Sequence, residues 1–253
     1  MVGDARLAHD LHGAIARGEI VAHYQPQVDL ASDRIVSAEA LARWNHPELG
    51  LISPAVFIPI AEETALIHSL GRFMIDEVLS TVSLWHSDGI DVEVSVNVSA
   101  TQLTTLEFFD RLDADLTKLE LAPNALTIEI TESHPILETP SITVRLDDLR
   151  LRGLGISIDD YGTGHSSLKQ LERMPATELK IDQSLVQDDS VEALALMTAV
   201  IELAHWRGLR VVAEGVETPA QLDLVRELRC DRAQGYLLGM PMPADELKKL
   251  VWA

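Results

Sequence analysis

Short β-rich segments alternate with helical segments along this chain, and that alternation limits its fold more than any other feature. Strands that alternate with helices usually pair in parallel through right-handed crossovers. Eight candidate strands in 253 residues match the size of an α/β protein of the (β/α)8 TIM-like barrel class. The expected strands are Ile20–Val28, Ile35–Ala42, Val92–Val98, Ala125–Ile130, Gly155–Asp159, Glu178–Ile181, Leu209–Ala213 and Ala233–Tyr236. The expected helices are Ser69–Trp85, Leu106–Leu119, Ser141–Leu151, Ser166–Leu171, Val191–Trp206, Ala220–Leu228 and Ala244–Leu250.

The first two strands depart from this alternation. About six residues separate Val28 from Ile35, which is too few for a helical crossover between parallel strands. We therefore expect an antiparallel first hairpin, so that one strand of the barrel is reversed. Before it, Leu7, Leu11 and Ala14 share a helical face with Ile15, which predicts a short docking helix. No linker or repeat divides the chain, and we expect a single domain over residues 1–253.

Composition narrows the class of protein. Hydrophobic residues make up 47% of the chain but aromatic residues only 4%, so we expect branched aliphatic side chains to fill the barrel. The formal charge of −20 argues against binding to DNA or RNA polymers through a basic surface. A single cysteine, Cys230, fits a reducing compartment. No apolar stretch is long enough to cross a bilayer, and we expect a cytoplasmic protein without membrane contact.

Several of the apolar strands contain or end at a carboxylate or a carboxamide. These residues are Glu39, Asn97, Glu129, Glu132, Asp159, Asp160 and Glu214. A carboxylate in an apolar segment is costly unless something compensates its charge. Any one of them could be an ordinary solvent-facing or turn residue. Together, on successive strands, they indicate one shared cation site.

Their spacing supports that interpretation. Asn97 and Glu129 are 32 residues apart, Glu129 and Asp159 are 30 apart, and Lys180 and Glu214 are 34 apart, so each strand–helix unit contributes one group. In a (β/α)8 barrel the carboxyl ends of the strands meet at one mouth. Clusters of oxygen ligands suit hard cations such as Mg²⁺ or Mn²⁺. The adjacent pair Asp159 and Asp160 would face opposite sides of a regular strand, but both could turn toward the mouth where the strand ends.

Other site chemistries find no support in the motifs. The segment DYGTGHSSL has neither the third glycine nor the lysine of nucleotide-binding loops. The histidines form no zinc motif, and no G-x-S-x-G sequence marks a serine nucleophile.

Seven segments follow one another along the chain: HYQPQVDL, SAEALARWNHPELGLISPAVFIPIAEE, SVNVS, LTIEITES, SIDDYGTGHSSLKQLERMPATELKID, VVAEGVET and AQGYLLGMPMP. Together and in this order, they carry a resemblance to the EAL-domain family of cyclic di-GMP phosphodiesterases. It implies a (β/α)8 barrel with one antiparallel strand. It also implies hydrolysis of cyclic di-GMP to linear pGpG with two Mg²⁺ or Mn²⁺ ions, by a homodimer.

The same resemblance implies a role for each site residue. Glu39, Asn97, Glu129 and Asp159 would hold one metal, and Asp159 would bridge to a second metal that Asp160 also binds. Lys180 would orient the attacking water or steady the phosphate, while Glu214 and Gln234 would complete the shell of water and metal. Glu132 would brace the loop that carries the aspartates, and Arg43 would grip a substrate phosphate. Gln25 and Glu217 would be substrate or supporting positions.

The chain departs from the family pattern mildly. Tyr161 and His165 replace the usual Phe and Tyr, and Asp33 and Ala65 stand where the family often has glycine. Two other functions are alternatives to a phosphodiesterase. A catalytically silent EAL-type receptor for cyclic di-GMP would typically have lost metal ligands, and here none is substituted. An enolase-like enzyme would use the carboxylates and Lys180 but would need neither Asn97 nor Gln234.

Overall fold

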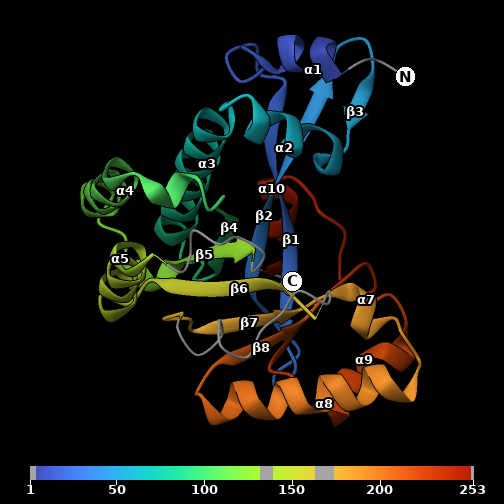
Figure 1. The fold of residues 1–253 in the computed structure, drawn as a ribbon. Helices are drawn as coiled ribbons and strands as arrows, with labels where there is room; N and C mark the ends of the chain where they lie inside the picture. Colours follow the sequence, from blue (N-terminus) through green and yellow to red (C-terminus); the bar gives the residue numbers. More distant parts are fainter. Residues whose placement is uncertain (1–3, 132–138, 163–173, 252–253) are drawn as a thin grey trace.

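Eight strands close into a barrel in the computed structural model, which describes residues 4–131, 139–162 and 174–251 (Figure 1). The order around the ring is β1-β9-β8-β7-β6-β5-β4-β2, and β1 pairs with β2 to close it. The short strand β3 pairs with β2 outside the ring. The strands are β1 (Ile20–Asp29), β2 (Arg34–His46), β3 (Gly50–Ile52), β4 (Glu93–Asn97), β5 (Leu126–Thr131), β6 (Gly155–Tyr161), β7 (Glu178–Ile181), β8 (Arg210–Ala213) and β9 (Arg232–Gln234).

Strand β1 is the reversed strand, as the short first connection predicts. It runs antiparallel to both of its neighbours in the ring, β2 and β9, while the other neighbours in the ring are parallel. The turn between β1 and β2 ends at Asp33, whose φ of 58° lies in the left-handed region. Ala65 has the same φ of 58°. These are the two positions at which the chain departs from the glycine that is frequent in the family it resembles, and glycine adopts this conformation without strain.

Most helices cover the outside of the ring, while the first two lie beside the end of the β1–β2 hairpin that extends beyond it (Figure 1). The helices are α1 (Asp4–Leu11), α2 (Pro54–Glu63), α3 (Ile67–Ser87), α4 (Leu106–Lys118), α5 (Pro140–Leu151), α7 (Gln183–Val186), α8 (Val191–Trp206), α9 (Pro219–Glu227) and α10 (Ala244–Val251), with 3-10 turns at Gln102–Thr104 and Pro123–Ala125. Helix α2 was not predicted from the sequence, because Pro59 lies inside it and proline usually ends a helix. The helix expected at Ser166–Leu171 lies outside the described residues. In the part that is described, no helix is long and apolar enough to cross a membrane.

The interior of the barrel is polar, so the expectation of a branched aliphatic filling was wrong. Side chains alternate between the two faces of a strand. On β5, Ile128 and Ile130 face the surrounding helices and are fully buried there, while Thr127 and Glu129 face the lumen. The neighbouring strands alternate in the same way, for example Ile156 and Ile158 around Ser157. The aliphatic residues therefore build the core between the sheet and the helices rather than inside the ring.

Side chains inside such a barrel form levels of four, each level drawn from alternate strands. The strand registers define four levels here. The mouth level contains Gln25, Asn97, Asp159 and Glu214, and the carboxylate level below it contains Glu39, Glu129, Lys180 and Gln234. The serine level contains Gln27, Ser95, Ser157 and Val212, and the floor contains Ser37, Thr127, Glu178 and Arg232 together with Glu93 and Arg210.

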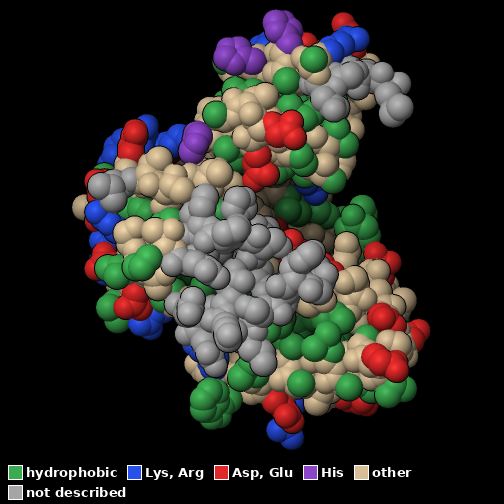
Figure 2. Space-filling model, in the orientation of Figure 1, with side chains coloured by type: hydrophobic (Ala, Val, Ile, Leu, Met, Phe, Trp, Pro, Cys, Tyr) green, Lys and Arg blue, Asp and Glu red, His purple; other side chains and the backbone are tan. Residues whose placement is uncertain are grey.

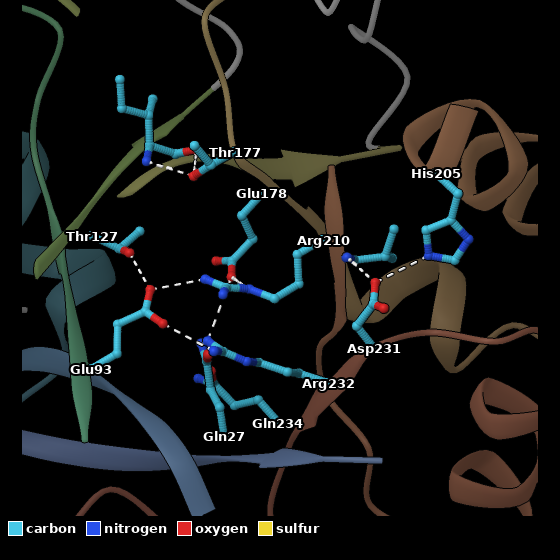
Figure 3. A network of polar contacts seen from close by, with 12 residues as sticks. Gln27, Glu93, Thr127, Thr177, Glu178, His205, Arg210, Asp231, Arg232 and Gln234 are labelled. Carbon is cyan, nitrogen blue, oxygen red and sulfur yellow. Dashed lines mark hydrogen bonds and ion pairs between the residues drawn. The ribbon is translucent and has the colours of Figure 1, made fainter. Parts of the chain in front are cut away.

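Ion pairs close the floor (Figure 3). The guanidinium of Arg210 lies 2.6 Å from Glu178 Oε2 and 2.8 Å from Glu93 Oε1. Arg232 lies 2.9 Å from Glu93 Oε2, and the hydroxyl of Thr127 also donates to Glu93. Glu93 on β4 thus links β5, β8 and β9 across the ring. Burial by itself raises the pKa of Glu93, but Arg210 and Arg232 outweigh it and the pKa lies below its ordinary value.

Replacing Glu93 should destabilise the barrel in a pH-dependent way. Glu93→Gln leaves two partly buried guanidinium groups without their shared anion, and we expect a loss of about 2–4 kcal/mol in the free energy of unfolding at pH 7. Because the folded-state pKa of Glu93 is lowered, its contribution is present above about pH 4.3 and is lost as the pH falls through the folded pKa. Urea titrations at several pH values should show the difference shrinking toward acid. A Glu202→Gln variant on the outer face of α8 is the control, and an equal loss there would contradict the role of the floor.

Candidate functional site

Four carboxylates, three from strands and one from the residue that follows β8, surround the ammonium group of Lys180. Its Nζ lies 2.7 Å from Glu214 Oε1 and 2.8 Å from Glu129 Oε2. Asp159 Oδ1 is 3.1 Å away and Glu39 Oε2 is 3.4 Å away. Lys180 is only 1% exposed, so its charge is compensated by these groups rather than by water. The structure therefore brings together residues that sequence analysis assigned to one site.

Carboxamides hold Glu39 from two sides. Asn97 Nδ2 donates to Glu39 Oε1 at 2.8 Å, and Gln234 Nε2 donates to Glu39 Oε2 at 2.6 Å. The same nitrogen of Gln234 donates to Gln25 Oε1 at 3.1 Å. An ionised carboxylate only accepts hydrogen bonds, so Gln234 must present its amino group to Glu39 and turn its oxygen away.

That oxygen accepts from a residue that sequence analysis missed. Gln27 Nε2 donates to Gln234 Oε1 at 2.9 Å, and Gln27 is 1% exposed. The available signal was the spacing of two between Gln25 and Gln27 on one apolar strand, which places both carboxamides on the same face. Gln27 thereby determines which way the amide of Gln234 points.

A bulge brings Asp159 and Asp160 to the same side. The register between β6 and β7 shifts between Ile158 and Tyr161, and Asp160 has a φ of 58°. This left-handed conformation, which aspartate adopts more readily than most residues, breaks the alternation of the strand. Ligand oxygens of Asp159, Asp160 and Glu214 consequently lie within 4.8 Å of one another. The adjacent aspartates can therefore share a cation.

Negative charge is in excess at this site. Burial raises the pKa of Glu214 to about 8 and that of Asp160 to about 6, and the nearby carboxylates add to the effect. Burial and the charges of Glu39 and Asp159 also raise the pKa of Glu129 well above its ordinary value. For Glu39, burial is outweighed by Lys180 and the two carboxamides, which lower its pKa.

Lys180 alone does not balance these charges. Burial lowers its pKa, but the surrounding carboxylates raise it by more, so the side chain is an ammonium ion in this arrangement. Among the described residues, Glu129 Oε1 is buried without a hydrogen-bond partner. A group of carboxylate oxygens with surplus charge and an unpaired buried oxygen fits a hard divalent cation. The cluster can therefore bind metal.

Polar groups line a cavity of about 360 Å³ above the cluster. Gln25, Glu217, Gln234 and Tyr236 line it together with Lys180. Glu217 does not cap α9, because the side chain of Thr218 makes that cap, and its exposed carboxylate is free to face the cavity rim.

Arg43 follows Glu39 on β2 and lies half-buried. Burial lowers the pKa of Arg43 by more than the nearby Tyr236 and Glu39 raise it, so this pKa lies below its ordinary value. Its Nη1 donates to the carbonyl of Ala42 at 3.0 Å. The guanidinium of Arg43 thus lies close enough to the acidic cluster to interact with Glu39. Glu132, the remaining expected site residue, lies outside the described residues.

A second cavity, of about 450 Å³, adjoins the cluster on the side of α2 and α3. Its walls are mainly apolar and include Ile58, Pro59 and Met74, while Asn97 and Asp160 stand at its boundary with the cluster. Figure 2 shows a hollow below the α2 region with acidic side chains beside it. The sequence did not predict the apolar wall of this cavity, because helix α2, which forms part of it, was not predicted. A flat apolar ligand group next to a metal-bound anion would fit the combined space.

Comparison with known proteins places the chain in a family. The EAL domain model matches residues 8–241, so the chain belongs to the EAL domain family. It is 42% identical over 246 residues to a bifunctional diguanylate cyclase/cyclic di-GMP phosphodiesterase, MucR, of Pseudomonas aeruginosa, covering 96% of this chain and 36% of that protein. It is 37% identical to the cyclic di-GMP phosphodiesterase PA2567 of the same organism, covering 89% of this chain and 39% of that protein. The chain thus spans little more than a third of the length of these two relatives.

Solved structures agree with this assignment. The PaMucR phosphodiesterase in complex with c-di-GMP superposes with a TM-score of 0.90 at 41% identity, covering 96% of this chain and 99% of that chain. The EAL enzyme Bd1971 in its cAMP- and cyclic-di-GMP-bound form gives a TM-score of 0.91 at 31% identity, covering 98% and 69%. The barrel with one reversed strand is therefore the fold of the family.

Divalent metal should stabilise the fold measurably. Mn²⁺ that binds only the folded state should add about 2.7 kcal/mol to the free energy of unfolding at a concentration of 100 Kd. Asp159→Asn keeps the shape but removes one charge from the cluster, and we expect it to weaken Mn²⁺ binding at least about tenfold. Isothermal titration calorimetry and thermal melts with and without Mn²⁺ measure both effects. An Asp189→Asn variant on the surface is the control, and equal Mn²⁺ binding by both variants would exclude the cluster as the site.

Proposed function

We propose that this chain is a phosphodiesterase that hydrolyses cyclic di-GMP to linear pGpG and so lowers the level of a second messenger. The observation that carries the proposal is the cluster around Lys180, in which every described metal position implied by the family motif is present and near the others. The named activities of the relatives and the c-di-GMP complex of a close structural neighbour support it.

We infer that two divalent ions, Mg²⁺ or Mn²⁺, serve the reaction. Glu39, Asn97, Glu129 and Asp159 would hold one, and Asp159 and Asp160 would hold the other, with Glu214 completing the set. Such ions supply a strongly nucleophilic water at neutral pH and neutralise the phosphodiester. The polar atoms of the cluster favour this assignment, because oxygen ligands with surplus negative charge suit these ions.

The chain's own residues orient the reactants. Lys180 donates from a fixed position among carboxylates, so it can direct the attacking water or steady a phosphate oxygen. Arg43 can grip the phosphate with its planar guanidinium. Gln234 keeps Glu39 in place, and Gln25 and Glu217 face the cavity where substrate would lie. Glu132 keeps its proposed role as a brace for the aspartate loop. The oxygen of water bonds to phosphorus, the bond from phosphorus to the 3′ oxygen breaks, and a proton passes to that oxygen.

The apolar cavity beside the cluster supports a nucleotide substrate over a small carboxylic acid. A guanine base would fit between α2 and α3 while the phosphate meets the cluster. An enolase-like reaction would leave this cavity unused, and it would also leave Asn97 and Gln234 without a purpose.

The direct test is the incubation of the chain with cyclic di-GMP and Mg²⁺, followed by nucleotide chromatography. We expect linear pGpG to accumulate, and we expect Glu39→Ala to reduce its rate by about a hundredfold or more while the barrel stays folded. Glu202→Ala, on the outer surface of α8, should retain the full rate. Tight binding of cyclic di-GMP without any pGpG would instead identify a silent receptor.

We further propose that residues 1–253 act as one domain in the cytoplasm, without DNA, RNA or membrane partners, and assemble as a homodimer. The formal charge of −20 supports the lack of a nucleic-acid partner. Multi-angle light scattering at micromolar concentration should give twice the 27.8 kDa mass of the chain. A monomer under those conditions would refute the dimer without affecting the proposed hydrolysis.

A further inference from the structure

We propose that the barrel binds a cluster of ordered water molecules at its serine level, directly beneath the carboxylate level. The proposal concerns the interior of the barrel rather than its mouth. It stands independently of the proposed hydrolysis, although its effect on metal binding rests on the proposed metal site.

The first observation is a group of buried polar atoms that lack hydrogen-bond partners among the described residues. The atoms are Glu129 Oε1, Gln27 Oε1, Ser95 Oγ, Ser157 Oγ, Ser37 Oγ and Arg232 Nη1. Their residues are at most 8% exposed, and Glu129 and Ser157 are fully buried. An unpaired buried polar group costs about 1–3 kcal/mol, and buried polar groups in folded proteins nearly always find a protein or water partner.

The second observation is that these atoms occupy neighbouring levels of one lumen. Glu39 pairs with Ser95, Glu129 with Ser157, and Ser37 with Gln27 along the strands. Gln27, Ser95 and Ser157 belong to the same level, with Glu129 one level above and Ser37 and Arg232 one level below. Figure 3 shows Gln27 and Gln234 beside the ion pairs of the floor.

The third observation is size. Such levels are commonly filled by bulky branched side chains, but this one has two serines and Val212 besides Gln27. Because serine side chains are small, we expect room toward the axis, and the ion pairs of the floor lie on its lower side. A polar, enclosed space lined by several unpaired groups is where buried water is found in proteins.

The chemistry of the lining selects water over an ion. Gln27 Oε1 needs a donor, and Arg232 Nη1, which lies 3.7 Å from Glu178 Oε2, still lacks a hydrogen-bond acceptor. The carboxyl group of Glu129 and the three hydroxyls can pair with either. A cation would be repelled by Arg232, and an anion would be repelled by Glu39, which pairs with Ser95 from the level above. Water both donates and accepts, so a few connected molecules satisfy the whole set.

The water cluster would also position a residue of the metal site. Lys180 holds Glu129 Oε2 at 2.8 Å, and water hydrogen-bonded to Oε1 would fix the other oxygen. A carboxylate oxygen has two lone pairs, so Oε1 could bind water and still offer one lone pair to the metal. Groups that hold a metal ligand in place typically change metal affinity 10–100-fold when they are lost. Ser95 and Ser157 are thus positioning residues that act on Glu129 through water.

A crystal structure of the unchanged chain at about 1.5 Å resolution or better is the first test. We expect ordered water within hydrogen-bond distance of Ser157 Oγ and Glu129 Oε1. A serine level without water density, or one filled by rearranged side chains, would overturn the proposal whatever the enzymatic activity of the chain. This result does not depend on any variant.

Variants at Ser157 test whether the space at the serine level holds water. Ser157→Val fills the space and displaces water, so we expect a lower melting temperature and Mn²⁺ affinity reduced about tenfold. Ser157→Ala keeps the room for water and should have a smaller effect on both. If the space is dry, Ser157→Val should instead raise the melting temperature and leave Mn²⁺ affinity unchanged. Ser80→Val, at an exposed position of α3, is the matched control and should change neither.

Discussion

The ammonium group of Lys180 and the carboxylates around it organise the whole molecule. Glu39, Glu129, Asp159 and Glu214 come from β2, β5, β6 and the end of β8, and all lie within 3.4 Å of Lys180 Nζ. Without the ammonium, these side chains would repel one another at the centre of a closed ring, in surroundings where an unpaired buried charge is very unfavourable. Even with the ammonium group present, the carboxylates outnumber the positive charges, and a bound divalent cation would balance the remaining negative charge.

Barrels of this class are usually filled by branched aliphatic side chains, and this one has a polar interior. The residues that form the apolar core and the residues that form the site therefore lie on opposite faces of the same strands. The aliphatic side chains of the strands face the helices and provide the apolar core, as Ile128, Ile156 and Leu179 do. The lumen is held instead by hydrogen bonds and ion pairs, from the carboxamides of Gln27 and Gln234 down to Glu93 and the two arginines of the floor. Substitutions on the outer face of a strand should therefore change stability alone. Substitutions at the upper levels of the inner face should also change binding and chemistry, while those in the floor should again change stability.

The strained backbone conformation of Asp160 also helps to form the site. The bulge at Asp160 costs the chain a left-handed aspartate, and it brings two adjacent carboxylates to one side of β6. A regular strand would have sent one of them outward among the helices. The backbone of β6 thus supplies the close pair of carboxylates that a shared cation requires.

Much of the fold could be predicted from the sequence, because hydrophobic periodicity and short connections are local properties. The strand–helix alternation predicted the barrel, and the short segment after Val28 predicted the reversed strand. The spacing of polar residues at strand ends predicted which side chains meet. Helix α2 was not predicted because Pro59, which lies inside it, is the usual signal of a helix end. Gln27 was not predicted as a site residue because its partner Gln234 lies 207 residues away.

The sequence by itself determined the alternation of polar and apolar residues in segments such as LTIEI and GISID. It did not determine which face would point inward, because alternation is the same whichever way a sheet curves. The closure of the ring decided that question. Helices covering the outside can bury the aliphatic face only if the polar face lines the lumen, and that placement gathers the carboxylates around Lys180 and leaves the serines beneath them.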